Sequence, residues 1–148
     1  MFQDFCKYSL SVVDNIALGR EVENWGPNLR NLAEQLGLAL LIENKGVLGK
    51  EFGTLELSGG QWQRVAMARC FYYDKSFYLL DEPTSAIDPL QEKAINNLIT
   101  TFAKGKTMVV ISHRLSIARL ADRVLVLDNG TIVQEGAHHQ LLKAKYAS

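Results

Sequence analysis

The spacing of apolar and polar positions divides the chain into a helical first part and a mixed second part. Apolar residues recur at the spacing of one helix face in a run that contains Leu29, Leu32, Ala33 and Leu36. Gly37 follows this run and predicts the end of that helix, because glycine readily adopts the left-handed conformation found after helix C-termini. From Ser11 to about Glu56 we therefore expect mostly helix, broken by glycines before residue 57.

Short apolar runs in the second part predict strands that alternate with helices. Residues 77–80 and 108–111 are wholly apolar, as is typical of parallel strands that are covered on both faces. Residues 59–71 have the spacing of an amphipathic helix, and residues 89–102 predict a second helix with Pro89 in its first turn, where proline is tolerated. This alternation is typical of a wound α/β sheet.

The last part of the chain predicts a hairpin and a terminal helix. Residues 124–127 and 131–133 flank Asp128-Asn129-Gly130, and Asn-Gly supplies the two residues with positive φ that a tight hairpin turn needs. Residues 138–146 then predict a helix, in which we interpret His138 and His139 as surface residues.

Composition limits the classes of function. The 148 residues are enough for one domain, and the formal net charge is zero, which gives no electrostatic reason to expect nucleic acid as a partner. No apolar run approaches the roughly 20 residues of a membrane-spanning helix. The two cysteines lack metal-ligand spacing, so we expect free, buried thiols in a reducing compartment.

Two short segments have the residues of an anion site and of an acidic catalytic site. Ser58-Gly59-Gly60 precedes a predicted helix, whose first turn offers unpaired N–H groups and partial positive charge to a phosphate. Taken alone, the same residues favour a plain N-capped helix after a flexible turn. Asp81 and Glu82 end the apolar run 77–80, and carboxylates at such a position are costly unless they have a task.

In their order along the chain, these segments resemble the nucleotide-binding domain of ATP-binding-cassette (ABC) transporters. The run Leu57–Gln61 resembles the family signature and Phe77–Glu82 its Walker B strand. Ser85–Asp88 resembles the D-loop, and His113 the switch histidine. Phe2-Gln3-Asp4-Phe5 resembles the Q-loop and looks most like exporter-type cassettes.

The resemblance implies a role for each matching residue. It implies that Glu82 polarises the attacking water, that His113 contacts the γ-phosphate, and that Asp81 and Gln3 hold Mg²⁺, mostly through water. The residues that it implies for contact with the ATP of a partner subunit, across a head-to-tail dimer, are Ser58, Gly59, Gly60, Gln61 and Asp88. The cofactors implied are therefore ATP and Mg²⁺.

The sequence lacks the phosphate-binding P-loop of this family. No G-x-x-x-x-G-K-[ST] occurs in it, and Gly105-Lys106-Thr107 has Thr100 where the first glycine belongs. We therefore expect an α/β fold with an incomplete P-loop NTPase-like parallel sheet and a helical subdomain, without the N-terminal β-subdomain and the P-loop strand. The expected segments are a Q-loop remnant (1–10), a helical subdomain (11–57), a core remnant (58–136) and a terminal helix (137–148). The chain alone is expected to be inactive as an ATPase.

The resemblance also implies partners and a location. The partners are the transmembrane domain of a transporter and a second ABC ATPase domain, with no nucleic acid. The location is cytoplasmic, at the cytoplasmic face of the membrane, where the transmembrane domain holds the chain. Strand edges left by the absent P-loop strand predict a rearranged sheet or self-association. Two alternatives stay open: a non-catalytic module that only docks on a P-loop-bearing partner, and the C-terminal lobe of a chromosome-maintenance ATPase. The compact helical segment and the neutral charge argue against the second.

Overall fold

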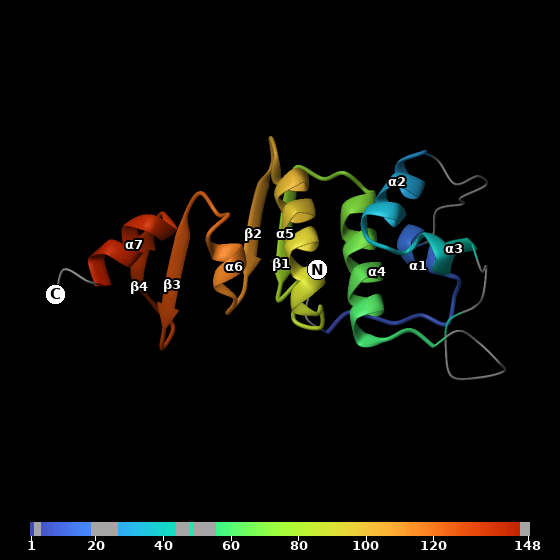
Figure 1. The fold of residues 1–148 in the computed structure, drawn as a ribbon, viewed down its shortest axis with the longest axis horizontal. Helices are drawn as coiled ribbons and strands as arrows, with labels where there is room; N and C mark the ends of the chain where they lie inside the picture. The colour runs from blue at the N-terminus through green and yellow to red at the C-terminus, as the bar shows by residue number, and fades with distance from the viewer. Residues whose placement is uncertain (2–3, 19–26, 44–47, 49–55, 146–148) are drawn as a thin grey trace. The chain divides into compact units, whose positions relative to one another are not determined.

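The computed structural model describes residues 1, 4–18, 27–43, 48 and 56–145 (Figure 1). The chain forms two compact units, Met1–Ile111 and Ser112–Ser148. The described structure is mixed α/β, with a small parallel sheet in the first unit and a small antiparallel sheet in the second. The α/β class expected from the sequence is thus confirmed.

Helices form the first part of unit one, as the apolar spacing predicts. They are α1 (Val12–Ala17), α2 (Pro27–Gln35) and α3 (Ala39–Glu43), and α1 and α2 pack against α4 (Gly59–Tyr72). The predicted apolar face of α2 is buried at Leu29, Leu32, Ala33 and Leu36. Burial of this one face is what holds a helix as short as α2, because such helices are marginal in isolation.

Gly37 ends α2 as predicted, with a φ of +63°. Its N–H donates to the carbonyl oxygen of Glu34 at 3.0 Å, and the N–H of Leu38 donates to that of Ala33 at 2.7 Å. These two bonds form a Schellman motif, which satisfies carbonyl groups that the helix itself leaves unpaired. Leu38 is fully buried, so the turn also directs the chain back into the core.

Helix α4 is buried on more than one side, whereas the sequence predicted an amphipathic helix. Its buried residues are Trp62, Gln63, Val65, Ala66, Met67, Ala68 and Phe71. Small alanines among them let neighbouring elements approach from several directions, so the helix has little polar face to present. The helices α1 and α2 contact it, and its Phe71 reaches the sheet.

The parallel sheet of unit one consists of β1 (Phe77–Asp81) and β2 (Thr107–Ile111), joined through α5 (Pro89–Ala103). Phe71 of α4 stacks on Phe102 of α5 at 4.3 Å between ring centroids, and meets the edge of Tyr78 of β1 at 5.5 Å. This aromatic cluster fixes both helices against the face of β1 that contains Tyr78 and Leu80, which are buried.

The other face of this sheet departs from the expectation of strands covered on both faces. Phe77, Val109 and Ile111 are 54%, 44% and 53% exposed. Side chains alternate between the faces of a strand, so these residues lie on the face opposite Tyr78 and Leu80. The helices α4 and α5 pack on the Tyr78 and Leu80 face, and the opposite face stays exposed although its residues are apolar.

The second unit contains α6 (Leu115–Ala118), β3 (Val124–Asp128), β4 (Thr131–Gly136) and α7 (His138–Lys145). The predicted hairpin is confirmed: β3 pairs antiparallel with β4, and the turn residues Asn129 and Gly130 have φ of +47° and +76°. Among the described residues, β3 and β4 form a sheet of their own and do not extend the parallel sheet of β1 and β2.

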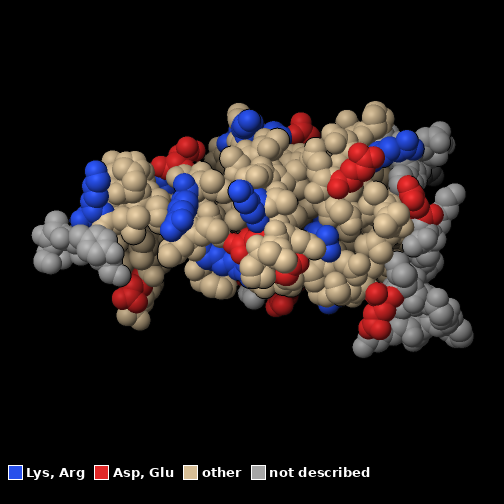
Figure 2. All heavy atoms as spheres, in the orientation of Figure 1, with Lys and Arg blue, Asp and Glu red and all other residues tan. Residues whose placement is uncertain are grey.

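Three further properties of the described residues bear on the sequence expectations. No described helix is both long and apolar enough to span a bilayer. Both cysteines are free, but Cys6 is exposed and Cys70 is half-buried, so the expectation of buried thiols was wrong for Cys6. Figure 2 shows acidic and basic side chains interspersed among uncharged ones on the face drawn.

Candidate functional site

The acidic turn, residues 81–88, begins where β1 ends. The main-chain N–H of Asp81 donates to the carbonyl oxygen of Met1 at 3.0 Å, and that of Glu82 donates to the carbonyl oxygen of Ile111 at 2.9 Å. Glu82 has a φ of +45°, a left-handed conformation that costs a residue with a β-carbon about 1–3 kcal/mol. Both acids are half-buried at the carboxyl ends of parallel strands, the edge where open α/β sheets bind ligands.

Main-chain and side-chain bonds hold the rest of the acidic turn. The N–H of Ser85 donates to the carbonyl oxygen of Glu82 at 3.2 Å. The carboxylate of Asp88 accepts from the N–H groups of Leu90 and Gln91 at 3.0 and 3.1 Å, and so caps the N-terminus of α5. Asp88 therefore has a structural task in this chain, in addition to the role that its sequence position implies.

The serine–glycine turn, residues 58–61, caps α4. The hydroxyl of Ser58 accepts from the N–H of Gln61 at 3.2 Å, while the side chain of Gln61 accepts from the N–H of Ser58 at 2.8 Å. This reciprocal pair is a capping box. The N-capped helix start is thereby confirmed, and the 14 residues of α4 direct their N-terminal dipole to this turn.

The serine–glycine turn and the acidic turn are in direct contact. A β-carbon placed on Gly60 would lie 2.8 Å from the carbonyl oxygen of Ala86, closer than real contacts allow, and one on Gly59 would lie 3.8 Å from the β-carbon of Ala86. Gly60 is therefore needed for the close approach of two backbones. The fold thus brings together two segments that stand more than twenty residues apart in the sequence.

Gln63, which the sequence analysis did not single out, joins the two turns. Its side chain is 2% exposed. Its amide nitrogen donates to the carbonyl oxygen of Glu82 at 2.8 Å and to the hydroxyl of Ser85 at 3.0 Å, and its amide oxygen accepts from the N–H of Ala86 at 2.8 Å. A polar residue of α4 thus pairs three polar groups of the acidic turn.

A signal for Gln63 was present in the sequence. It follows Gly59 by four positions and Gly60 by three, which places all three residues on one side of a helix. An uncharged polar residue among Trp62, Val65 and other buried positions is costly to bury without partners. The pattern therefore indicated a partner for Gln63, although it could not indicate which one.

The structure does not place the two remaining predicted site residues relative to these turns. Gln3 is outside the described residues. His113 belongs to the second unit, two residues after β2 ends, and is exposed. The action of His113 together with Glu82 stays a prediction.

Among the described residues, the carboxylate of Asp81 could help to hold Mg²⁺, but it lacks the further protein ligands that a fully protein-coordinated metal ion needs. Within the described ranges, no group of three or more His, Cys, Asp or Glu could hold a metal ion. Asp81 offers one half-buried carboxylate at the end of β1. Mg²⁺ is commonly held by one or two carboxylates together with waters and substrate phosphates, so Asp81 suits a magnesium ion brought by a nucleotide.

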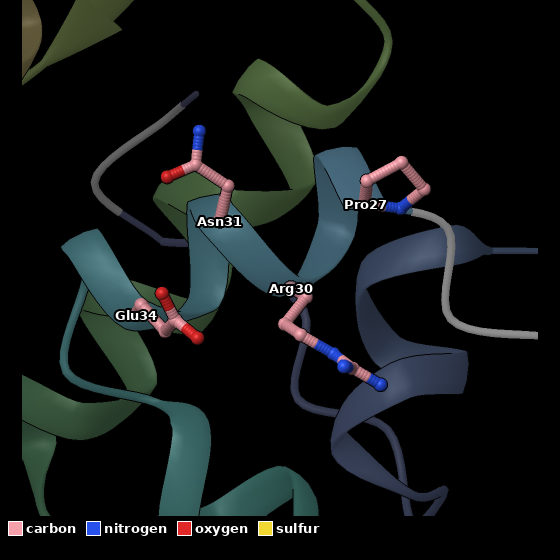
Figure 3. Close-up of a pocket in the computed structure, with 4 residues that line it drawn as sticks. All are labelled: Pro27, Arg30, Asn31 and Glu34. Carbon is pink, nitrogen blue, oxygen red and sulfur yellow. The ribbon is translucent and has the colours of Figure 1, made fainter.

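A shallow hollow on α2 does not belong to this site. It has a volume of about 420 Å³ and is lined by Pro27, Arg30, Asn31 and Glu34. In Figure 3 all four side chains arise from α2 and project from that one helix. A hollow lined by one exposed helix encloses little of any ligand, so it gives no reason to move the site from the two turns.

Comparison with known proteins relates most of the chain to ABC transporters. A family model described as "ABC transporter" matches residues 1–85. The subtilin transport ATP-binding protein of Bacillus subtilis is 39% identical over 152 residues, which cover 97% of this chain and 24% of that protein. The ATP-dependent lipid A-core flippase of Burkholderia thailandensis is 37% identical over 150 residues, which cover 95% of this chain and 24% of the flippase.

A solved structure supports the same relationship. A bacterial Atm1-family ABC exporter with ATP bound matches with a TM-score of 0.81 and 32% sequence identity, over 97% of this chain and 26% of the exporter. The chain thus spans about a quarter of the length of the relatives that it matches.

Proposed function

The chain belongs to the ABC transporter family, and from this premise we propose that it is part of an ATPase subunit that powers export across a membrane. In this proposal it supplies the signature motif, the Walker B acids and the switch histidine to a dimeric ATPase. The four segments 1–10, 11–57, 58–136 and 137–148 are the proposed functional division. The names of two relatives, a transport ATP-binding protein and a flippase, support a transport role.

The observation that carries the proposal is the contact between the serine–glycine turn and the acidic turn. The first offers the N-terminus of α4, where N–H groups and the helix dipole favour a phosphate. The second offers Asp81 and Glu82 at the ligand-binding edge of a parallel sheet. The two turns are joined by the hydrogen bonds of Gln63 and by the close approach of Gly60 to Ala86. Such an arrangement suits a protein that handles phosphate with one turn and activates water with the other.

Each residue has a proposed role in hydrolysis. Glu82 accepts a proton from the attacking water as general base, a contribution of roughly 10²–10⁴-fold. Asp81, with Gln3, holds Mg²⁺ through water, and the ion neutralises charge on the phosphates when bound. His113 donates a hydrogen bond to the γ-phosphate. Ser58 and the two glycines after it bind the γ-phosphate held by a partner subunit.

The proposed partners follow from these roles. A second ATPase domain holds, on its own P-loop, the nucleotide that the serine–glycine turn contacts, and hydrolysis drives a transmembrane domain at the cytoplasmic face of the membrane. Each lost P-loop hydrogen bond to phosphate is worth roughly 1.5–3 kcal/mol. We therefore expect the 148-residue chain alone neither to bind Mg-ATP with micromolar affinity nor to hydrolyse it, and calorimetric titration tests this.

A chimera tests the proposed function. Residues 1–148 replace the homologous quarter of the subtilin transport ATP-binding protein, and phosphate release from Mg-ATP is measured. We expect hydrolysis by the chimera and a loss of about 100-fold or more when Glu82→Gln removes the base. A folded chimera without ATPase activity, or one whose rate is unchanged by Glu82→Gln, would contradict the proposal.

The exposed surface of the β1–β2 sheet favours association between copies of the isolated chain. Among the described residues β2 lies at the edge of a two-stranded sheet, and an exposed edge strand invites pairing with another chain. Phe77, Val109 and Ile111 also present apolar side chains to solvent, so we propose that isolated chains associate through this edge and the apolar face beside it. Sedimentation at increasing concentration should show dimers or larger species, and Val109→Lys should shift them to monomer. A monomer at every concentration would contradict this.

A further inference from the structure

We propose that Gln63 is a positioning residue that couples the serine–glycine turn to Glu82, so that a phosphate bound at one turn sets the geometry of the other. The coupling deepens the proposed function and rests on it. In the proposed dimer the serine–glycine turn serves the partner's nucleotide, whereas Glu82 serves a nucleotide on its own subunit. Gln63 therefore links two ATP sites through one chain.

The hydrogen bonds of Gln63 admit one orientation of its amide. The nitrogen faces two oxygens, those of the Glu82 carbonyl and the Ser85 hydroxyl, and the oxygen faces the N–H of Ala86. A rotated amide would put its oxygen against the Glu82 carbonyl and its NH₂ group against an N–H, and would lose these bonds. Gln63 thus fixes the backbone conformation of the acidic turn through directed hydrogen bonds, which an apolar side chain of the same size could not do.

The backbone of Glu82 needs such a restraint. A left-handed φ of +45° at a glutamate persists only where the surroundings determine it. The N–H of Glu82 donates to the carbonyl of Ile111, and its carbonyl accepts from the side chain of Gln63 at 2.8 Å and, more weakly, from the N–H of Ser85 at 3.2 Å. The direction of the carboxylate depends on this backbone, so loss of the shorter bond, from Gln63, is expected to misplace the base.

The serine–glycine turn acts on the same loop through a rigid element. Gly60 contacts the carbonyl of Ala86, and Gln63, one helical turn later, holds its N–H. Both contacts come from α4, a continuous helix of 14 residues. A displacement of the helix N-terminus by a phosphate is therefore passed to the acidic turn, with no intervening flexible segment.

Amide hydrogen exchange of the 148-residue chain tests whether Gln63 restrains the acidic turn. Gln63→Met keeps the length of the side chain but removes its hydrogen bonds, and the exchange rate of the Ala86 amide should rise by about tenfold. The milder Ser85→Ala removes one partner from an exposed position and should raise that rate by about threefold. The matched control is Val65→Ala, on the same helix and fully buried, which should not single out Ala86. An unchanged exchange rate of the Ala86 amide in Gln63→Met would show that Gln63 does not restrain the acidic turn and would overturn the proposal.

Kinetics of the chimera test the coupling. Gln63→Met should lower kcat by about tenfold while KM for ATP changes by less than about twofold, because a misplaced base affects the chemical step more than binding. Val65→Ala should leave kcat near the parent value. An active parent chimera with full kcat in Gln63→Met would overturn the coupling alone. An inactive parent chimera would overturn the proposed function, and the coupling with it.

Discussion

Replacement of Gly60 by alanine probes the closest backbone contact in the candidate site. The added β-carbon would lie 2.8 Å from the carbonyl oxygen of Ala86. That oxygen belongs to a loop whose neighbouring groups are bound by Gln63, so the loop has little freedom to move away. Gly59→Ala is the matched control, because its β-carbon would meet the β-carbon of Ala86 at 3.8 Å, an ordinary contact.

Two opposing terms decide the size of the effect. Alanine in place of glycine in a helix gains up to about 1 kcal/mol. Insertion of a methyl group into a close-packed contact costs about 1–3 kcal/mol. Gly60→Ala bears both terms and should destabilise the chain by about 1 kcal/mol on balance. Gly59→Ala has only the gain, so the two variants should differ by about 2 kcal/mol.

Urea unfolding followed by circular dichroism measures this difference in the free energy of unfolding. The wild-type chain and both variants are compared at equal protein concentration, because association would shift the midpoints. The expected order of stability is Gly59→Ala, then wild type, then Gly60→Ala. If Gly60→Ala were as stable as Gly59→Ala, the two turns would not be in contact and the candidate site would be wrong.

Three further predictions concern other parts of the first unit. Ser58→Ala removes the cap of α4 and should cost about 1 kcal/mol in urea unfolding; an unchanged midpoint would refute the capping role. Asn15 is fully buried, donates to three carbonyl oxygens and accepts from Arg69, so Asn15→Ala should cost about 2–4 kcal/mol by the same measurement. A cost below that of Ser58→Ala would argue against this network. Burial raises the pKa of the Cys70 thiol, so less thiolate is present at pH 8 and iodoacetamide should modify Cys70 more slowly than exposed Cys6. Mass spectrometry of digests gives the two rates, and faster modification of Cys70 would contradict its placement.

Local patterns predicted much of the fold. The apolar positions of α2, the glycine that ends it and the Asn-Gly hairpin are each set by residues close together in the sequence. Such features are encoded where they occur. The cap of α4 is of the same kind, because Ser58 and Gln61 satisfy each other's N–H groups within one helical turn.

Features that depend on distant partners were predicted less well. The apolar run of β2 gave no indication that Val109 and Ile111 would be exposed, because coverage depends on what packs against the strand. Gln63 escaped notice for the same reason: its three partners lie about twenty residues away in the sequence. The motifs marked which segments carry the chemistry, but not the side chain that joins them.

The left-handed backbone of Glu82 bears on how an inactive form of this protein is best made. Glycine at position 82 would remove the carboxylate and also relieve the unfavourable φ, so the loop would become more flexible. Any change in ATP binding or hydrolysis would then have two causes. Glutamine retains the β-carbon and the same conformational penalty. Of these two variants, Glu82→Gln therefore keeps the backbone conformation of the loop under the same penalty while it removes the proton acceptor.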